Sequence, residues 1–364
     1  MTRPTVLLGM SGGVDSSVAA ALLVRQGYKV HGLTLQVWEQ EDETVSASKK
    51  WQERGCCKVG IAKHVAKLLN ISHEVVDTRE TFRKGVIDDF LHGYTTGTTP
   101  NPCVRCNERV KIRGLMDLAA SRNFNYVATG HYARLKNNHG TPVLARAADE
   151  RKDQTYFLYR LNPHWLPRLL FPLGNLEKSD VWREAEALGL PADELKESQE
   201  ICFVTQGDYR TFIEKEVPEA KKPGLFIDEA GQPLGQHEGI AFYTPGQRRG
   251  LGIATGQRLY VQQVRQATNT VMLGPEESLR RQECTVSDLN IFDSRLMERP
   301  AEAHVKVRYA TAQTPAVLSA LNSSSIRIHF REAQRALSPG QSAVFYEGDH
   351  VLGGGIIQPF LTPS

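Results

Sequence analysis

Apolar and polar positions follow two alternating patterns over the first third of the chain. Short apolar runs predict strands at Thr5–Gly9, Lys29–Trp38, His73–Asp77 and Tyr126–Thr129. Between them, apolar residues three or four positions apart predict helices at Ser16–Gln26, Val59–Leu69, Phe82–Leu91 and near Val110–Ser121. Alternating strands and helices favour a parallel sheet covered by helices on both faces, with ligands at the carboxyl ends of the strands.

The pattern changes after Asp153. Two further helices are predicted at Trp165–Phe171 and Ser179–Leu188. From about Gly207 the chain is rich in glycine, proline and glutamine, with a candidate strand at Leu259–Val264. These features predict a small domain that is separate from the parallel sheet.

The C-terminal residues alternate apolar and polar positions, as at Val305, Val307 and Tyr309, which predicts a small antiparallel barrel or sandwich. We therefore expect an α/β protein in three parts. They are a doubly wound parallel-sheet domain over residues 1–205, a small central domain over residues 206–281 and an antiparallel β-barrel over residues 282–364.

Composition narrows the class of protein. The 364 residues include six cysteines, 18 prolines and 30 glycines, which excludes a disulfide-stapled miniprotein, a collagen-like repeat and a low-complexity chain. Apolar stretches such as Val18–Val24 are far shorter than the roughly 20 residues of a membrane span, and no basic and apolar leader precedes Val6. We expect a cytoplasmic protein without a membrane partner, in which thiols stay reduced unless they carry chemistry.

Charge is unevenly distributed, although the net charge is only +3. Residues 1–150 hold 20 basic and 15 acidic side chains. Basic residues gather at 105–113 and again at 239–275, where four arginines occur with no acid at all. Both stretches either meet phosphates or form an ordinary solvated surface.

A glycine-serine motif, SGGVDSS, occupies Ser11–Ser17 between the first predicted strand and the first predicted helix. Gly12 and Gly13 allow a ligand to approach the backbone, and the amides of a helix N-terminus suit a phosphate. The motif lacks the lysine of a GxxxxGK[ST] P-loop, which argues against simple γ-phosphate transfer. It resembles instead the pyrophosphatase loop of enzymes that cleave ATP between its α and β phosphates.

A proline-rich segment, predicted as a loop, carries a Cys-x-x-Cys pair. The segment runs from Gly97 to Asn107, and its cysteines are Cys103 and Cys106. Basic residues after it would help to keep a nearby thiol ionised. The spacing suits a reactive thiolate, a redox disulfide or part of a metal site, although one pair cannot complete a four-cysteine zinc site.

The other cysteines have weaker contexts. Cys202 lies between two apolar neighbours, so it is either a buried structural cysteine or a partner of the Cys-x-x-Cys pair. Cys284 is expected in a core. Cys56 and Cys57 are expected to be structural, with ligand binding as the alternative.

Seven strings occur in the order typical of tRNA-specific 2-thiouridylases, and the chain resembles this family over essentially its whole length. They are SGGVDSS, the TPNP segment with its CN, ATGHYAR at 128–134, KDQ at 152–154, the ICF that contains Cys202, TPGQRRGLGI at 244–253 and PGQSAVFY at 339–346. The resemblance implies a pyrophosphatase-loop domain, a small central domain and a C-terminal β-barrel that together bind tRNA. The implied reaction replaces O2 of the wobble uridine with sulfur.

The resemblance also implies roles for individual residues. ATP, with Mg²⁺, would be bound by Gly9, Met10, Ser11, Gly12, Gly13, Val14, Asp15, Ser16, Leu35 and Gly130. Cys202 would carry a persulfide that an upstream sulfur-relay protein supplies, and Cys106 would attack it, leaving a disulfide until it is reduced. The target base, flipped out of the anticodon loop, would meet Asn101, Pro102 and Cys103. Other tRNA contacts would come from His131, Lys152, Asp153, Gln154, Arg308, Tyr309 and Gln341.

One position departs from the family pattern. The best-known members have an aspartate three residues before the nucleophile, where this chain has Cys103. Either the Cys103 thiol replaces that carboxylate in acid-base chemistry, or Cys103, Cys106 and Cys202 hold an iron-sulfur cluster with one open position for sulfide. We favour the persulfide because the context of Cys202 is shared with members that carry the aspartate.

Two other classes of protein compete with this interpretation. Another adenylating ligase or amidotransferase partner, for instance one like argininosuccinate or GMP synthetase, would use the same loop without a cysteine pair or an RNA surface. A non-catalytic RNA-binding protein with structural zinc would not need the ATP loop. Release of pyrophosphate from ATP, measured with and without tRNA, separates the three.

Overall fold

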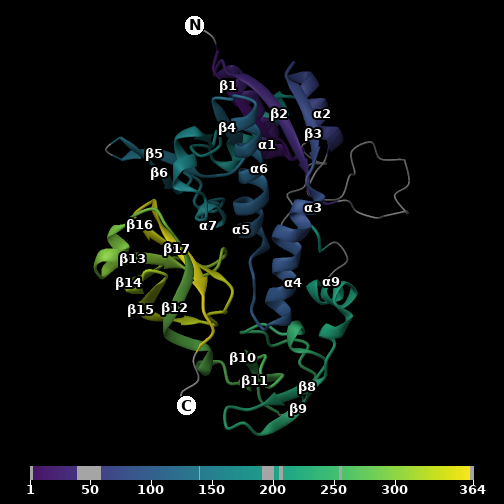
Figure 1. The fold of residues 1–364 in the computed structure, drawn as a ribbon, viewed down its shortest axis with the longest axis vertical. Helices are drawn as coiled ribbons and strands as arrows, with labels where there is room; N and C mark the ends of the chain where they lie inside the picture. Colours follow the sequence, from purple (N-terminus) through teal and green to yellow (C-terminus); the bar gives the residue numbers. More distant parts are fainter. Residues whose placement is uncertain are drawn as a thin grey trace. The chain divides into compact units, whose positions relative to one another are not determined.

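The computed structural model describes residues 3–38, 59–138, 140–190, 201–204, 208–253 and 256–360. Cys56 and Cys57, expected to be structural, lie outside the described residues. The chain forms two compact units, one of residues 1–86, 103–205 and 349–351 and the other of residues 87–102, 206–348 and 352–364. Figure 1 labels most of their helices and strands.

The first unit is built on a five-stranded parallel sheet in the order β3-β2-β1-β4-β7. Figure 1 labels its first four strands. Its strands are β1 (Thr5–Gly9), β2 (Lys29–Gln36), β3 (Ser72–Asp77), β4 (Tyr126–Thr129) and β7 (Leu169–Leu170). The first four confirm the strands predicted from short apolar runs.

The helix predicted at Trp165–Phe171 is wrong in its second half. A short 3₁₀ helix, η3, spans Pro163–Arg168, and the edge strand β7 follows it. Pro167 has no amide hydrogen to donate, so the turn does not continue as an α-helix. The two leucines of β7 pair instead with β4.

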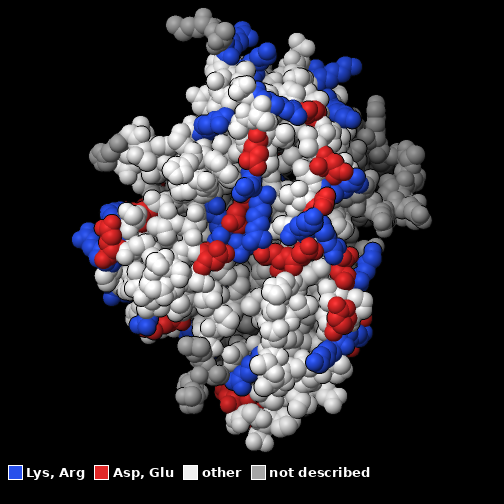
Figure 2. Space-filling model, viewed as in Figure 1, with Lys and Arg blue, Asp and Glu red and all other residues white. Residues whose placement is uncertain are grey.

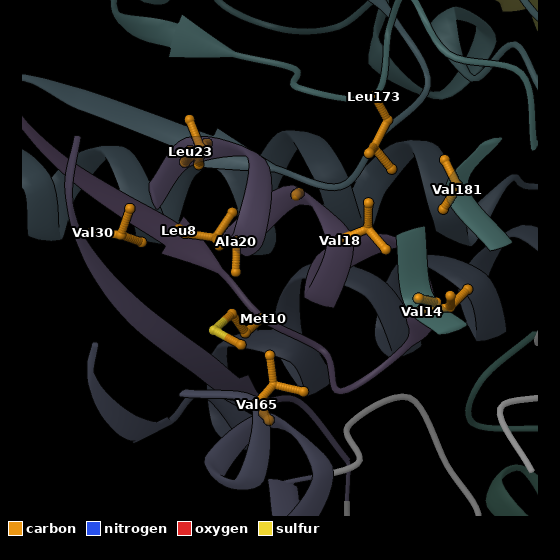
Figure 3. Close-up of a cluster of buried hydrophobic side chains, with 14 of the residues drawn as sticks. Leu8, Met10, Val14, Val18, Ala20, Leu23, Val30, Val65, Leu173 and Val181 are labelled. Atoms are coloured by element: carbon orange, nitrogen blue, oxygen red, sulfur yellow. The ribbon is translucent and has the colours of Figure 1, made fainter. Parts of the chain in front are cut away.

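Three helices contribute apolar faces to one core with β1 and β2: α1 (Val14–Arg25), α2 (Val59–Leu68) and α8 (Lys178–Ala187). Figure 3 shows part of this core, with Leu8, Val18 and Val181 among its side chains. The other face of β1 is covered by α6 (Ile112–Ser121), because a Cβ atom at Gly9 would lie 2.9 Å from Cδ1 of Leu115. The sheet is therefore covered on both faces, as predicted.

Helical segments also replace parts of two predictions. The helix expected at 82–91 is divided into α3 (Arg79–Phe82), the π-helical turn η1 (Arg83–Ile87) and α4 (Asp88–Thr95). The segment expected as a loop up to Asn107 is helical from its second proline onward, as α5 (Pro102–Cys106) and the π-helical turn η2 (Asn107–Lys111), which leads into α6. Proline at the first position of α5 loses no hydrogen bond there. The hairpin of β5 (Arg134–Asn138) and β6 (Thr141–Ala145) and the short α7 (Thr155–Leu158) follow β4.

The second unit contains a small sheet and a closed antiparallel barrel. After α9 (Tyr209–Glu216), the sheet has the order β10-β11-β8-β9. Its strands are β8 (Gly224–Ile227), β9 (Pro233–His237), β10 (Tyr260–Arg265) and β11 (Thr270–Gly274). Among the described residues of the chain, no helix is both long enough and apolar enough to cross a membrane.

The barrel has the strand order β12-β15-β14-β13-β16-β17 and is closed by pairing of β12 with β17. Its strands are β12 (Arg280–Ile291), β13 (Ala301–Lys306), β14 (Thr314–Asn322), β15 (Ser325–Arg335), β16 (Ser342–Glu347) and β17 (His350–Ile357). Alternate residues face its core, which includes Cys284 at 4% exposure. Burial raises the pKa of the Cys284 thiol to about 12, so this cysteine is a structural residue.

Candidate active site

The order of the strands in the sheet reverses at β1. The chain runs from β1 to β2 and β3 on one side, and then returns to pair β4 with the other side of β1. In open parallel sheets, ligands bind at such a reversal, outside the carboxyl ends of the two strands. Gly9 ends β1 and Gly130 follows β4, so two of the predicted nucleotide residues lie at this position.

The SGGVDSS loop leaves the N-terminus of α1 open. Gly12 has a φ of +77°, a left-handed conformation that glycine adopts without strain. The N-cap residue is Gly13, and the hydroxyls of Ser16 and Ser17 donate back to its carbonyl oxygen at 3.0 and 2.9 Å. Among the described residues no side chain caps this end of the helix, which leaves its first amides to a bound anion.

Gly130 fits closely against the first turn of α1. A Cβ atom at this position would lie 2.8 Å from the carbonyl carbon of Asp15 and 2.8 Å from the amide nitrogen of Ser16. These atoms belong to the backbone, so a side chain at position 130 would push the loop away from β4. Met10 and Leu35 are 2% and 7% exposed, so Met10 offers a nucleotide little more than its backbone.

Asp15 is the charged residue of this loop, and it makes two contacts through one oxygen. Its Oδ1 accepts hydrogen bonds from the hydroxyl of Tyr132 at 2.9 Å and from Nζ of Lys178 at 2.6 Å. Its Oδ2 has no hydrogen-bond partner among the described residues, and Mg²⁺ uses one or two such carboxylates together with phosphate oxygens. Sequence reasoning missed Tyr132 and Lys178, because separations of 117 and 163 residues leave no local signal.

His131 follows Gly130 and is held by Thr129, whose Oγ1 lies 2.8 Å from its Nδ1. Burial, and then the positive charge of Lys111, lower the pKa of His131 to about 3. The ring is therefore neutral at neutral pH, and it can meet a ligand as a hydrogen-bonding group rather than as a cation.

The cysteines of the Cys-x-x-Cys pair lie on the helix α5. Cys103 is exposed and Cys106 is buried. The π-helical turn η2 begins directly after Cys106, and such distortions are frequent at functional sites. The predicted nucleophile thus sits on a helix and not in the proline-stiffened loop that the sequence predicted.

Glu108, on η2, binds three arginines. Its Oε1 lies 2.8 Å from Nε of Arg160, and its Oε2 lies 3.0 Å from Nη1 of Arg105 and 3.8 Å from Nε of Arg109. The side chains of Arg105 and Arg160 are 14% and 9% exposed, so water screens this network weakly. The Glu108 carboxylate therefore joins the helix of Cys106, through Arg105, to Arg160 beyond α7.

Cys202 is partly exposed and belongs to the first unit, as do Cys103 and Cys106. Its neighbour Phe203 is buried, with ring centroids 6.4 Å from Trp38 and 5.7 Å from Phe82. None of the described cysteines forms a disulfide. In the same described segments, no group of three or more His, Cys, Asp or Glu side chains is placed to hold a metal ion, so the geometry lends no support to a three-cysteine cluster.

Two residues of the predicted tRNA-binding tripeptide 152–154 have partners inside the protein. Asp153 is 3% exposed, and its carboxylate accepts hydrogen bonds from the Ala147 amide at 3.0 Å and from Oγ1 of Thr155 at 2.7 Å. Oε1 of Gln154 accepts a hydrogen bond from the Tyr132 amide at 2.9 Å. Asp153 and Gln154 thus shape this turn, whereas Lys152 is partly exposed to solvent.

In the second unit, a turn of the barrel holds the TPNP segment. The amide of Thr99 donates to the Pro339 carbonyl at 2.7 Å, and Nε2 of Gln341 donates to the Thr99 carbonyl at 2.9 Å. A Cβ atom at Gly340 would lie 2.8 Å from the Thr99 nitrogen. Gln341, predicted to contact tRNA, therefore supports the chain that continues to Asn101 and Pro102.

A basic cavity of about 620 Å³ lies in the second unit. Its lining includes Arg210, Arg249, Arg308 and one acid, Asp208, together with residues 244–247 of the TPGQ string. Nη2 of Arg308 donates to the Ala336 carbonyl at 2.6 Å and lies 2.8 Å from Oγ of Ser338, so this side chain is fixed in place.

The surface near Arg308 also presents an aromatic ring. Tyr309 is 36% exposed, and the ammonium of Lys306 lies 5.3 Å from its ring centroid. An exposed ring next to a cation suits base stacking and phosphate contact. On the face drawn in Figure 2, however, lysine and arginine side chains lie among aspartate and glutamate side chains and do not form one continuous field.

A parallel sheet with a glycine-serine loop at its reversal point defines a HUP-domain protein, and the family models agree. Residues 4–206 match the tRNA methyl transferase HUP domain, residues 210–275 the tRNA methyl transferase PRC-barrel domain and residues 281–357 the aminomethyltransferase beta-barrel domain.

The chain is 44% identical to the tRNA-specific 2-thiouridylase MnmA of Pelotomaculum thermopropionicum over 98% of both chains. It is 44% identical to that of Acetivibrio thermocellus, over 98% of this chain and 100% of the relative. A solved structure, NMN synthetase from Francisella tularensis, is 19% identical over 59% of this chain and 77% of that one, with a TM-score of 0.32, too low to support any inference. The chain belongs to the family of tRNA-specific 2-thiouridylases, which are tRNA-uridine 2-sulfurtransferases.

Proposed function

We propose that this protein carries out ATP-dependent 2-thiolation of the wobble uridine in tRNA, with sulfur delivered from a persulfide on Cys202. The observation that carries the proposal is the open N-terminus of α1 at the reversal of the sheet, in a chain that matches this family over nearly its full length. The persulfide route is preferred to a cluster because the three cysteines are not grouped as metal ligands among the described residues.

ATP is one of the proposed substrates, and the SGGVDSS loop has the features that bind its phosphates. The uncapped amides of α1, the left-handed Gly12 and the close fit of Gly130 leave backbone for the phosphates. Asp15 would hold Mg²⁺, which would draw negative charge away from the phosphates. Leu35, near the end of β2, would contact the adenosine.

Activation makes O2 of the uridine a leaving group. O2 attacks the α-phosphorus of ATP, the bond from that phosphorus to the bridging oxygen breaks, pyrophosphate departs, and the base loses its N3 proton. The role of an acid-base group in this exchange falls to Cys103, which is exposed at the start of α5. The chemistry needs no γ-phosphate transfer, which agrees with a loop that has no P-loop lysine.

Sulfur transfer to the activated base follows in two steps. A sulfur-relay protein leaves one sulfane sulfur on the Cys202 thiol. The Cys106 thiolate attacks Sγ of Cys202, the persulfide bond breaks, hydrosulfide is released, and a Cys106–Cys202 disulfide forms. Hydrosulfide adds to C2, and AMP leaves with the original O2. The two thiols have been oxidised and the sulfane sulfur reduced, so a dithiol reductant restores the enzyme.

The tRNA contacts are proposed for several partly exposed groups. Lys152 and the neutral His131 belong to the first unit. Arg308, Tyr309 and the basic cavity belong to the second, as does the segment Asn101–Pro102 that Gln341 supports. Because bases of an anticodon loop are unpaired, flipping the target uridine costs little. The domain boundaries at 205 and 281 and a cytoplasmic location stay predictions.

The experiment incubates the protein with ATP, Mg²⁺, a tRNA transcript and a persulfide donor, followed by mass spectrometry of the tRNA nucleosides. We expect 2-thiouridine together with one pyrophosphate per modified base. Cys106→Ser and Cys202→Ser should lose 2-thiouridine and keep tRNA binding, whereas Cys284→Ala, a change in the barrel core, should keep both. Wild-type rates of thiolation in either serine variant would exclude the proposed sulfur route.

A further inference from the structure

A buried lysine lies beneath the nucleotide loop. Lys178 is the first residue of α8 and is 9% exposed, and its amide donates to Oδ2 of Asp149 at 3.1 Å. Its Nζ lies 2.6 Å from Oδ1 of Asp15. Lysines are rarely buried unless they are paired, so this side chain is held at its position by the fold.

Two aromatic rings accompany the ammonium group. Nζ of Lys178 lies 5.5 Å from the ring centroid of Tyr132 and 5.2 Å from that of Trp182, both within the range of a cation-π interaction. Tyr132 also donates to the same oxygen of Asp15. The ammonium of Lys178, the phenol of Tyr132 and the carboxylate of Asp15 therefore form one hydrogen-bonded group beside the first turn of α1.

Stability alone does not account for this pair. Removing two opposite charges from water costs several kcal/mol, and apolar residues of similar size often stabilise a fold as well or better. The carboxylate belongs to the loop that offers its amides to an anion, and its side chain is 33% exposed, whereas that of Lys178 is 11% exposed. The pair thus connects the interior of the protein to the ligand side of the loop.

The charges of the loop indicate what the lysine does there. Asp15 is the one charged side chain in residues 9–17, and its sign opposes a polyphosphate. Lys178 cancels that charge and holds Oδ1, which leaves Oδ2 for Mg²⁺. An ammonium group has three donors, so it can hold Asp15 and a phosphate oxygen at the same time.

We propose that Lys178 is a phosphate-binding residue of this site, which orients Asp15 for Mg²⁺ and contacts the phosphates of ATP beyond the α position. Lys178 would replace the phosphate-binding lysine of a P-loop, which the SGGVDSS loop lacks. It comes from the helix α8, which begins 163 residues after Asp15. The inference rests on the proposed function, because it takes ATP as the ligand.

The test compares two nucleotides that differ in their outer phosphates. Calorimetry with Mg²⁺ measures the dissociation constants of α,β-methylene-ATP, which is not cleaved, and of AMP. For Lys178→Met we expect binding of the ATP analogue to weaken about 10- to 100-fold, the range of one charged hydrogen bond, and binding of AMP to change less than about threefold. Lys136→Met, which removes a lysine paired with Asp349, should leave both constants unchanged.

The outcomes separate the possible roles of the lysine. Equal weakening of both nucleotides would mean that Lys178 supports the loop without touching the outer phosphates, and unchanged binding would give it no role; either result overturns the inference. If the wild-type protein binds neither nucleotide, the ATP site of the proposed function falls as well. If the wild type binds the ATP analogue and Lys178→Met binds it with the same dissociation constant, the inference about Lys178 is overturned and the proposed ATP site stands.

A second pair of variants covers a failure of Lys178→Met to fold, since that change leaves Asp15 without its cation. Asp15→Asn and the double variant Asp15→Asn with Lys178→Met both lack the carboxylate, so they differ in the Lys178 side chain alone. The double variant holds no unpaired charge, and in the single variant the amide oxygen that replaces the carboxylate can still accept a hydrogen bond from Nζ. Without Mg²⁺, the single variant should bind the ATP analogue about tenfold or more tightly than the double variant. Equal affinities would show that the ammonium does not reach the phosphates.

Discussion

At the scale of single residues, the nucleotide site depends on the absence of one methyl group. In Gly130→Ala, the new Cβ would lie 2.8 Å from two backbone atoms of the loop, which cannot move independently. We expect the free energy of unfolding to fall by about 1–3 kcal/mol and ATP binding to weaken more than tenfold, as calorimetry and chemical denaturation would measure.

Gly114 on α6 provides the matched control for this change. A Cβ atom there meets Cδ1 of Leu35 at an ordinary 3.7 Å. Gly114→Ala should keep ATP binding and raise stability by up to about 1 kcal/mol, since alanine favours a helix. If both alanine variants bound ATP equally well, the close fit of Gly130 would have no functional meaning.

The role of the Cys103 thiol, in acid-base chemistry or as a cluster ligand, can also be tested by substitution. If it stands in for an acid-base carboxylate, Cys103→Asp should keep activity when it is purified in air and should need no iron. Thiolation assays and an iron and sulfide determination on anaerobically purified protein measure this. Near-stoichiometric iron that is lost together with activity in the variant would favour a cluster, because a carboxylate is a poor ligand in place of a soft thiolate.

The pKa of His131 gives a prediction about stability and pH. The folded protein holds this pKa at about 3, whereas an unfolded chain binds the proton near pH 6.5. Unfolding therefore takes up a proton between these values, so stability falls as the pH is lowered through that window. The loss is at most about 1.4 kcal/mol per pH unit.

Chemical denaturation of the wild type and of His131→Gln at pH 7 and pH 5 isolates this contribution, since the other groups titrate alike in both proteins. We expect the wild type to lose more stability than the variant. Equal losses would mean that His131 accepts a proton in the folded state as readily as in the unfolded chain.

At the scale of elements, the helical segment of Cys106 depends on a carboxylate that holds arginines from two elements. In Glu108→Gln, the shielded guanidinium groups of Arg105 and Arg160 lose the carboxylate that they share. We expect a loss of about 1–3 kcal/mol in the free energy of unfolding and slower sulfur transfer. Glu80→Gln, which breaks the exposed pair with Lys84, should change neither. Similar effects of the two variants would show that the Glu108 network does not position Cys106.

The elements also show how far local patterns extend. The strands β1 to β4 and the helix α1 are predictable because a short apolar run or a helical period identifies each one. The strand β7 is two residues long and pairs with a distant strand, and α5 begins within a proline-rich segment, so neither carries a local signal. The π-helical turns likewise interrupt periods that sequence reads as continuous.

The residues of the candidate site also fall into those that the sequence predicts and those that only the fold brings together. Gly12, Gly13 and Asp15 are recognisable because their types and spacing suit a phosphate loop. Lys178 and Tyr132 are not, because their relation to Asp15 exists only after the parallel sheet has brought β4 and α8 to α1. Resemblance to the family supplied the cysteine roles, which composition and spacing alone left open.

At the scale of the whole molecule, affinity for tRNA must come from local charge, because the net charge is only +3. The basic cavity of the second unit is one such concentration. Arg308 is committed to Ala336 and Ser338, whereas the guanidinium of Arg249 has no partner among the described residues. Arg249 is thus the side chain whose removal should affect RNA binding without affecting the fold.

For Arg249→Gln we expect weaker binding of tRNA, whatever the tRNA sequence, and unchanged binding of ATP. Loss of one phosphate contact should make the slope of log affinity against log salt concentration shallower by about 0.7 to 0.9. Filter binding can measure this slope from about 50 to 300 mM salt, roughly the range in which such plots are linear. Arg331→Gln, which removes an exposed arginine paired with Glu302 on the barrel, is the matched control and should keep the wild-type slope. If both variants lower the slope equally, tRNA responds to total charge, and the cavity has no privileged contact with its backbone.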